Sequence, residues 1–138
     1  MKADPEFRFH TQEILRFGDQ DSQGHINNAV YSTLFECNRV AFQTTASHLK
    51  LESDQVVVVA AVAIDFLREL HWPGTVDIKL GVSNIGNSSF GFAQELWLGN
   101  EKIATAKSTQ VVIHRSTRKP MPLSKEQRAQ LNRWSVTI

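Results

Sequence analysis

Hydrophobic and polar positions follow two different periods in the first part of the chain. Between Phe7 and Phe17 the apolar side chains fall mainly on odd positions and the polar ones on even positions, which is typical of a half-buried strand. From Asn28 onward apolar residues recur at steps of three and four, and this spacing predicts a helix with a broad apolar face. Asn27 or Asn28 can cap its first turn, because an amide oxygen accepts an unpaired backbone N–H.

The later part of the chain has the pattern of strands. Apolar alternation or β-branched runs cover Gln55–Leu67, 76–83, 90–98 and Ile103–His114. Gly99-Asn100 is a hairpin signal, and Ser124 with Gln127 forms a capping box that predicts a short last helix. Four strands without an intervening helix favour antiparallel pairing. We therefore predict an α+β fold in which a five-stranded antiparallel sheet wraps around one long central helix, as a single domain over residues 1–138.

Composition narrows the classes of protein that this chain can belong to. The formal net charge is +1, so the chain lacks the electrostatic attraction typical of a nucleic-acid or membrane-surface binder. A single cysteine excludes an intrachain disulfide framework. The most apolar run, Val56–Ile64, has nine residues, fewer than a membrane span needs. The N-terminal residues carry no apolar signal sequence, so we expect a cytoplasmic protein.

Charge is unevenly placed along the chain. Residues 1–114 contain nine Lys and Arg against thirteen Asp and Glu, whereas residues 115–138 contain six Lys and Arg against one Glu. One interpretation is a solvated surface segment. The other is a small cationic patch for a phosphorylated ligand.

The densest polar cluster lies between the predicted first strand and the helix, within residues 19–28. Turns and helix caps use the same residue types, so composition alone leaves a structural role open. Two features favour chemistry: a helix N-terminus offers unpaired N–H groups to developing negative charge, and Asp21 and His25 are suited to nucleophilic or general-base work. Gly24 would let a substrate approach the backbone closely. These are the parts of an acyl-transfer site.

The same residues carry a resemblance to a known family. The signature D-x-x-G-H-x-N-N-x-x-Y of hot-dog-fold thioesterases, in the 4-hydroxybenzoyl-CoA thioesterase superfamily, resembles the string Asp21-Ser-Gln-Gly24-His25-Ile-Asn27-Asn28-Ala-Val-Tyr31. Further stretches that resemble the family are Ile64–Leu70 with Pro73-Gly74, Ile85–Phe90 and Val111–Pro122. The likeness covers nearly the whole chain.

The resemblance implies a hot-dog fold, assembly as a homodimer or as a homotetramer built from two dimers, and hydrolysis of acyl-CoA without a cofactor. Asp21 matches the catalytic carboxylate, acting as a nucleophile or as a general base. The backbone N–H of Asn28 matches the donor that polarises the thioester carbonyl, and Gly24 would lie beside that carbonyl. We assign His25 an assisting role in orienting substrate or water.

Substrate contacts are expected on three further groups of residues. The spacing Asp21-x-Gln23-x-His25 also resembles the D-x-N-x-H of acyl-ACP thioesterases, which makes Gln23 a candidate, and Tyr31 lies on the helix face of the pocket. Coenzyme A brings phosphates, so cations just after the last strand are candidate partners. The expected phosphate contacts are Arg115, Arg118 and Lys119 just after the last strand, with Ser88 and Ser89 at the entry to the fourth strand.

Two further expectations concern metals and the cysteine. The histidines outside the polar cluster have no metal-ligand spacing along the chain, so we predict no metal site. Cys37 lies among apolar neighbours in the predicted helix, and we expect it to be buried and unreactive.

Alternative functions stay open at this level. An acyl-ACP thioesterase would use the same residues on a different thiol carrier. A hot-dog hydratase acting on enoyl or hydroxyacyl thioesters would need an Asp/His pair at a spacing different from that of Asp21 and His25. A non-catalytic acyl-CoA-binding module is a third alternative, because a fold alone does not guarantee chemistry.

Overall fold

The computed structural model describes residues 6–137, so the first five residues of the N-terminal segment lie outside the description. In chain order the strands and helices are β1 (Phe9–Ile14), the short 3₁₀ helix η1 (Phe17–Asp19), α1 (Asn28–Gln43), β2 (Gln55–Phe66), β3 (Thr75–Ile85), β4 (Ser89–Leu98), β5 (Glu101–His114) and α2 (Lys125–Asn132).

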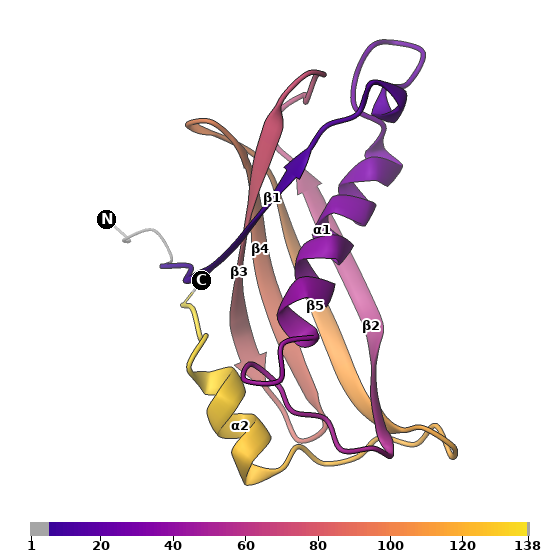
Figure 1. The fold of residues 1–138 in the computed structure, drawn as a ribbon, viewed down its shortest axis with the longest axis vertical. Coiled ribbons are helices and arrows are strands. Elements are labelled where there is room, and N and C mark those ends of the chain that lie inside the picture. The colour runs from indigo at the N-terminus through magenta and orange to yellow at the C-terminus, as the bar shows by residue number, and fades with distance from the viewer. Residues whose placement is uncertain (1–5, 138) are drawn as a thin grey trace.

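The five strands form one antiparallel sheet in the order β1-β3-β4-β5-β2, and α1 lies along one face of it (Figure 1). α2 lies at the end of the sheet opposite the start of α1 (Figure 1). The predicted α+β architecture is confirmed. The order places β2 and β1 at the two edges, although β2 and β3 are neighbours in the chain.

The predicted helix caps are confirmed at the N-termini of both α-helices. The Asn27 side chain accepts the backbone N–H of Ala29 and caps α1. Ser124 and Gln127 form the capping box of α2. In β1 the odd positions are half-buried and the even ones exposed, as period-two alternation predicts.

The core lies between α1 and the sheet, in two clusters of apolar side chains. The first gathers around Tyr31, Leu34 and Phe35 near the start of α1. The second gathers around Phe42 and the strand residues Phe90 and Phe92. α1 therefore has a fixed position on the sheet, and its N-terminus is fixed with it.

A polar network crosses this core. The Asn38 amide, fully buried on α1, donates to the Thr11 hydroxyl at 2.7 Å and to the Ile78 carbonyl at 3.2 Å. The Gln94 amide donates to the Asn38 oxygen at 2.8 Å and to the Phe35 carbonyl at 2.9 Å. Buried polar groups of this kind stabilise a fold only while each partner is present.

Asn38→Ala is expected to lower the free energy of unfolding by about 3 kcal/mol, since it leaves buried partners unsatisfied. Urea denaturation followed by fluorescence measures the change. Ser32→Ala, on the exposed face of α1, is the matched control and should change stability by less than about 0.5 kcal/mol. Equal effects of the two substitutions would contradict the role given to the network.

β2 is an open edge with exposed apolar side chains. It is hydrogen-bonded to β5 along one side, and Val59, Val62 and Phe66 on it are 45% to 48% exposed. An uncovered apolar edge strand is a template for pairing with another chain.

In contrast to the prediction, Cys37 is exposed, because α1 buries only one side of its broad apolar face. Partial burial still raises the pKa of the Cys37 thiol.

None of the helices in residues 6–137 has the length and hydropathy needed to cross a membrane.

Candidate active site

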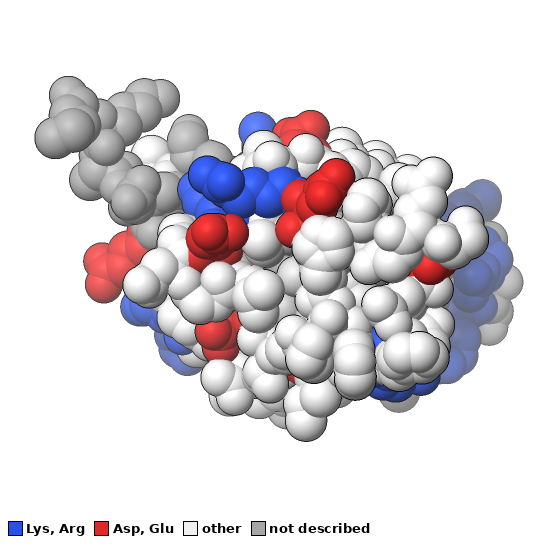
Figure 2. All heavy atoms as spheres, turned by 90° about the horizontal axis from the view of Figure 1, so that it is seen from above, with Lys and Arg blue, Asp and Glu red and all other residues white. Residues whose placement is uncertain are grey.

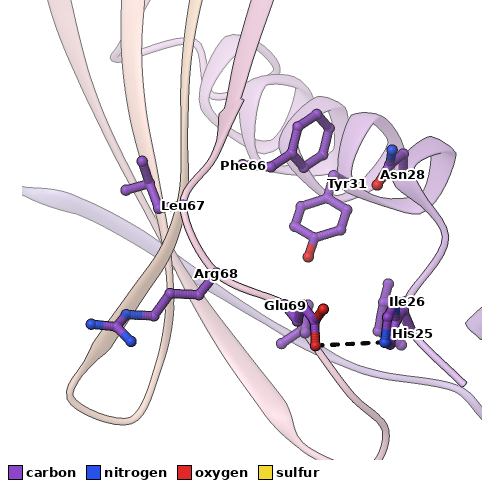
Figure 3. A pocket seen from close by; sticks show the side chains of 9 residues that line it. His25, Ile26, Asn28, Tyr31, Phe66, Leu67, Arg68 and Glu69 are labelled. Carbon is purple, nitrogen blue, oxygen red and sulfur yellow. Dashed lines mark ion pairs between the residues drawn. The ribbon is translucent and has the colours of Figure 1, made fainter.

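A cavity of about 260 Å³ opens where the start of α1 meets the end of β2. His25, Asn28 and Tyr31 line it from the α1 side, and residues 66–70 line it from the β2 side. Figure 3 shows the Tyr31 hydroxyl directed toward Glu69, while the Arg68 side chain extends away from the other labelled residues. The cavity is smaller than a typical ligand pocket of roughly 300 Å³ or more.

The loop before α1 is held in shape by the Asp21 side chain. Asp21 Oδ1 accepts the backbone N–H of Gln23 at 2.9 Å and that of His25 at 3.1 Å. Gly24 has a φ of +80°, a conformation that glycine adopts without strain. The predicted catalytic carboxylate therefore organises the loop, and Asp21, Gln23 and Gly24 lie outside the cavity lining.

The first turn of α1 contributes Asn28 to the lining of this cavity. The Asn27 side chain satisfies the N–H of Ala29, and the Asn27 carbonyl accepts the N–H of Val30. The N–H of Asn28 has no hydrogen-bond partner in the part of the chain that the structure describes. A helix N-terminus with such a donor stabilises negative charge on a nearby oxygen.

Tyr31 forms the floor of the cavity and is 3% exposed. Its ring packs edge-on against Phe66 with the centroids 4.9 Å apart. Burial raises the pKa of the Tyr31 hydroxyl, so it is a neutral hydrogen-bonding group at physiological pH.

Asp19 anchors the loop to the rest of the fold. Its carboxylate is 4% exposed, accepts the Arg16 guanidinium at 2.8 Å and the Arg16 backbone N–H at 2.8 Å, and its carbonyl accepts the N–H of Asn27. Burial alone would raise the pKa of Asp19, but the hydrogen bonds and charge of Arg16 outweigh it and lower that pKa.

Asp19→Asn is expected to destabilise the fold by about 1 to 3 kcal/mol at pH 7, because it removes a charged hydrogen-bond acceptor. A lowered folded-state pKa contributes stability above the ordinary value of 3.8 that is lost as the pH falls. The difference between variant and wild type should therefore shrink toward pH 3. Urea denaturation at several pH values measures it, with Glu101→Gln, at an exposed position at the start of β5, as control. A difference that is independent of pH would contradict this assignment.

A family model described as the thioesterase-like superfamily matches residues 15–131. The chain belongs to this superfamily. The matched segment includes the whole loop, α1 and the cavity lining. A search of curated protein sequences finds no match.

Solved structures similar to this thioesterase-like chain include the PA5185 protein from Pseudomonas aeruginosa, with 21% identity, a TM-score of 0.82 and coverage of 94% of this chain and 92% of that one. A 1,4-dihydroxy-2-naphthoyl-CoA thioesterase from Synechocystis has 18% identity, a TM-score of 0.77 and coverage of 90% and 95%. The protein SAV2348 from Staphylococcus aureus, solved in complex with CoA, has 16% identity, a TM-score of 0.81 and coverage of 91% and 82%. These likenesses confirm the predicted hot-dog fold.

The predicted contacts of this thioesterase-like chain fall at two ends of the sheet. His25, Asn28 and Tyr31 line the cavity. The predicted phosphate contacts gather at the far end, where β4 begins at Ser89 opposite Val111 of β5. The residues at this far end are Ser88, Ser89, Arg115, Arg118 and Lys119. The cavity and this far end are separated by the length of β2, roughly 35 Å of extended strand. A CoA thioester whose acyl carbonyl lies in the cavity therefore cannot reach the phosphate contacts of the same copy.

Sequence reasoning missed the side of the cavity that follows β2. Glu69 Oε2 lies 3.5 Å from His25 Nε2, and Ile26 donates its N–H to the Leu70 carbonyl at 2.8 Å. In the sequence, the run Ile64–Leu70 carries only a likeness to the family. A long-range contact, rather than spacing in the chain, brings it to the loop.

Proposed function

We propose that this chain is an acyl-CoA thioesterase that hydrolyses the thioester at the start of α1. The observation that carries the proposal is the N–H of Asn28, which has no hydrogen-bond partner within residues 6–137. Asn28 lines the cavity together with His25 and directly follows the loop that Asp21 organises. Membership of the thioesterase-like superfamily supports the reaction class. A similar fold holds CoA in the Staphylococcus aureus protein, which supports CoA as the thiol carrier.

The proposed chemistry uses the groups in order. The thioester carbonyl oxygen accepts the N–H of Asn28, and one such donor contributes about 3 kcal/mol to lowering the barrier. Asp21, through the carboxylate oxygen that does not hold the loop, either removes a proton from a water that attacks the carbonyl carbon or attacks that carbon itself. In the first route the C–S bond breaks, the CoA thiolate leaves and takes up the proton from Asp21, and the acid is released. In the second route the C–S bond breaks to leave an acyl anhydride on Asp21, the thiolate takes up a proton from solvent, and water hydrolyses the anhydride, which releases the acid and restores the carboxylate. His25 orients the water or the substrate.

We infer that the site is completed by a second copy bound along β2. Two β2 edges that pair antiparallel about a two-fold axis would extend the sheet and cover the exposed Val59, Val62 and Phe66. The small volume of the cavity supports a site that one copy forms only in part.

This pairing would bring the cationic end of the partner to the cavity. Pairing centred on the middle of β2 sets Phe66 of one copy opposite Gln55 of the other. Arg115 lies beside that end of β2, since its N–H donates to the Asp54 carbonyl at 2.7 Å and its side chain to the Ser53 carbonyl at 3.3 Å. Arg115, with Arg118 and Lys119 in the same turn, is therefore suited to binding the CoA phosphates across the interface.

The surface around the cavity supports this arrangement. Figure 2 views the molecule from above Figure 1, onto the end where α1 begins, and uncharged side chains make up most of that face. Arg68 is the one cation among the described residues that line the cavity, so a CoA bound to one copy alone would find a single lining cation for its phosphates.

The proposal is tested with purified protein and a panel of short, medium, long and aromatic acyl-CoAs, with free thiol measured by a thiol reagent. We expect thiol release with at least one class. The same acyl groups on acyl carrier protein identify the carrier, and faster hydrolysis there would favour the acyl-ACP alternative. Loss of the absorbance of an enoyl thioester without thiol release would favour a hydratase. Tight binding with no turnover across the panel would contradict an enzyme and favour a binding module.

A further inference from the structure

Three potential metal ligands converge at the mouth of the cavity, from two segments far apart in the chain. His25 lies in the loop before α1, and Glu69 and His71 follow β2. The ligand atoms of the three side chains all lie within 4.8 Å of one another. The two imidazole rings stand edge-on with their centroids 5.0 Å apart, so both present ring nitrogens to the same carboxylate.

The distances in this cluster are long for direct hydrogen bonds. Glu69 Oε2 lies 3.5 Å from His25 Nε2 and 3.4 Å from His71 Nε2, whereas an N–H···O bond spans about 2.7 to 3.2 Å. Zinc ligands lie about 2.0 to 2.1 Å from the metal, so two ligands of a tetrahedral site are about 3.4 Å apart. The separations of Glu69 from the two histidines match that edge, and the two histidine nitrogens lie within 4.8 Å of each other.

The hydrogen bonding of His71 also favours a metal ion in this cluster. Its Nδ1 lies 3.2 Å from the Gly24 carbonyl oxygen, and because a carbonyl only accepts, Nδ1 carries the hydrogen. In the neutral ring Nε2 then presents a lone pair toward the Glu69 carboxylate. Two electron-rich atoms at this separation are stabilised by a cation between them. A backbone carbonyl that fixes the tautomer of a metal-binding histidine is a common feature of metal sites.

We propose that His25, Glu69 and His71 bind one divalent transition metal ion of the zinc class, with water in the fourth position. Two imidazoles and one carboxylate form a ligand set that zinc accepts with an open position. This proposal replaces the expectation of no metal, which rested on spacing along the chain. It does not depend on the proposed hydrolase activity. His25 would be a ligand when the ion is bound and would be available to orient water or substrate when it is not.

A bound ion would join the loop before α1 to the segment after β2. In the structure these segments are joined by the backbone hydrogen bond from Ile26 to Leu70 and by the hydrogen bond from the His71 ring to the Gly24 carbonyl. Because an ion that binds only the folded state stabilises it, zinc is expected to raise the melting temperature of the protein. Since His25 and Glu69 also line the cavity, the ion would lie at its mouth.

The test uses untagged full-length protein freed of metal with a chelator that is then removed. Isothermal titration with Zn²⁺ should give one ion per chain, and Co²⁺ should give the visible absorption of a tetrahedral site. Glu69→Gln and His71→Asn should each weaken binding at least about tenfold and abolish the rise in melting temperature. Glu69 and His71 are exposed, so the metal-free variants should remain folded, and the melting temperature with zinc is compared with that of the same variant without zinc.

His10→Asn is the matched control, because His10 is exposed and its ring bonds to the Phe7 carbonyl three residues earlier, far from the proposed ligands in the sequence. It should bind zinc as the wild type does. The proposal is overturned if no stoichiometric binding occurs, or if His71→Asn and His10→Asn bind zinc equally. Absence of thioester hydrolysis would leave these binding outcomes unaffected, so failure of the proposed function is distinguished from failure of the metal site.

Discussion

Asp21→Asn is expected to lower kcat for acyl-CoA hydrolysis by about 10³-fold, because the side chain that attacks the thioester or activates water is lost. The substitution removes the negative charge without removing the hydrogen-bond acceptor of the loop. Asn keeps an oxygen that can accept the N–H groups of Gln23 and His25, which Asp21 Oδ1 accepts in the wild type. The loop geometry should therefore persist while the carboxylate chemistry disappears.

Steady-state kinetics with the best acyl-CoA of the panel measures the effect. Glu126→Gln is the matched control, since Glu126 is an exposed carboxylate on α2, at the end of the sheet opposite the start of α1 (Figure 1). Wild-type turnover by Asp21→Asn would exclude Asp21 as the catalytic carboxylate and would direct attention to His25 with Glu69, which face the cavity.

Ala61→Glu is expected to raise the dissociation constant of the dimer by roughly 100-fold, because it sets like charges close together across the two-fold axis. Ala61 is exposed and lies midway along β2. At protein concentrations where the variant is monomeric, KM for acyl-CoA should rise steeply, since the cations of the partner are lost from the site.

Analytical ultracentrifugation and kinetics over a range of protein concentrations test this prediction together. Ala129→Glu places the same charge on an exposed position of α2 and should leave both the dimer and KM unchanged. A dimer that survives Ala61→Glu would show that the copies associate through another surface. A monomer with unchanged KM would show that one copy binds CoA alone.

The features that sequence predicts well are those decided by neighbours in the chain. The cap by Asn27 and the capping box of Ser124 and Gln127 depend on atoms within three residues, and the structure confirms both. The alternation of β1 is confirmed for the same reason. Period and cap chemistry therefore predict where the main elements begin and what type they are.

The features that sequence misses are decided by packing between distant segments. Cys37 was expected to be buried, but the sheet covers only one side of α1 and leaves it exposed. The meeting of His25 with Glu69 and His71 depends on where β2 ends relative to the loop. Neither fact is encoded in local spacing, and the distance between the cavity and Arg115 likewise follows from the strand order.

The central claim is that a thioesterase site is formed by the Asp21 loop of one copy and the cationic turn of the other. The most direct measurement mixes two impaired variants, Asp21→Asn and the triple variant Arg115→Gln, Arg118→Asn and Lys119→Gln, and assays thioester hydrolysis below KM after subunit exchange. Asn is chosen at Arg118 because that residue has a φ of 63°, which Asn tolerates.

A mixed dimer would contain one intact site, so an equimolar mixture should recover about a quarter of wild-type activity. Each variant alone should stay far below that value. If the mixture is no more active than the average of the two separate variants, Asp21 and the cationic turn do not serve one site across the interface, and the account is contradicted.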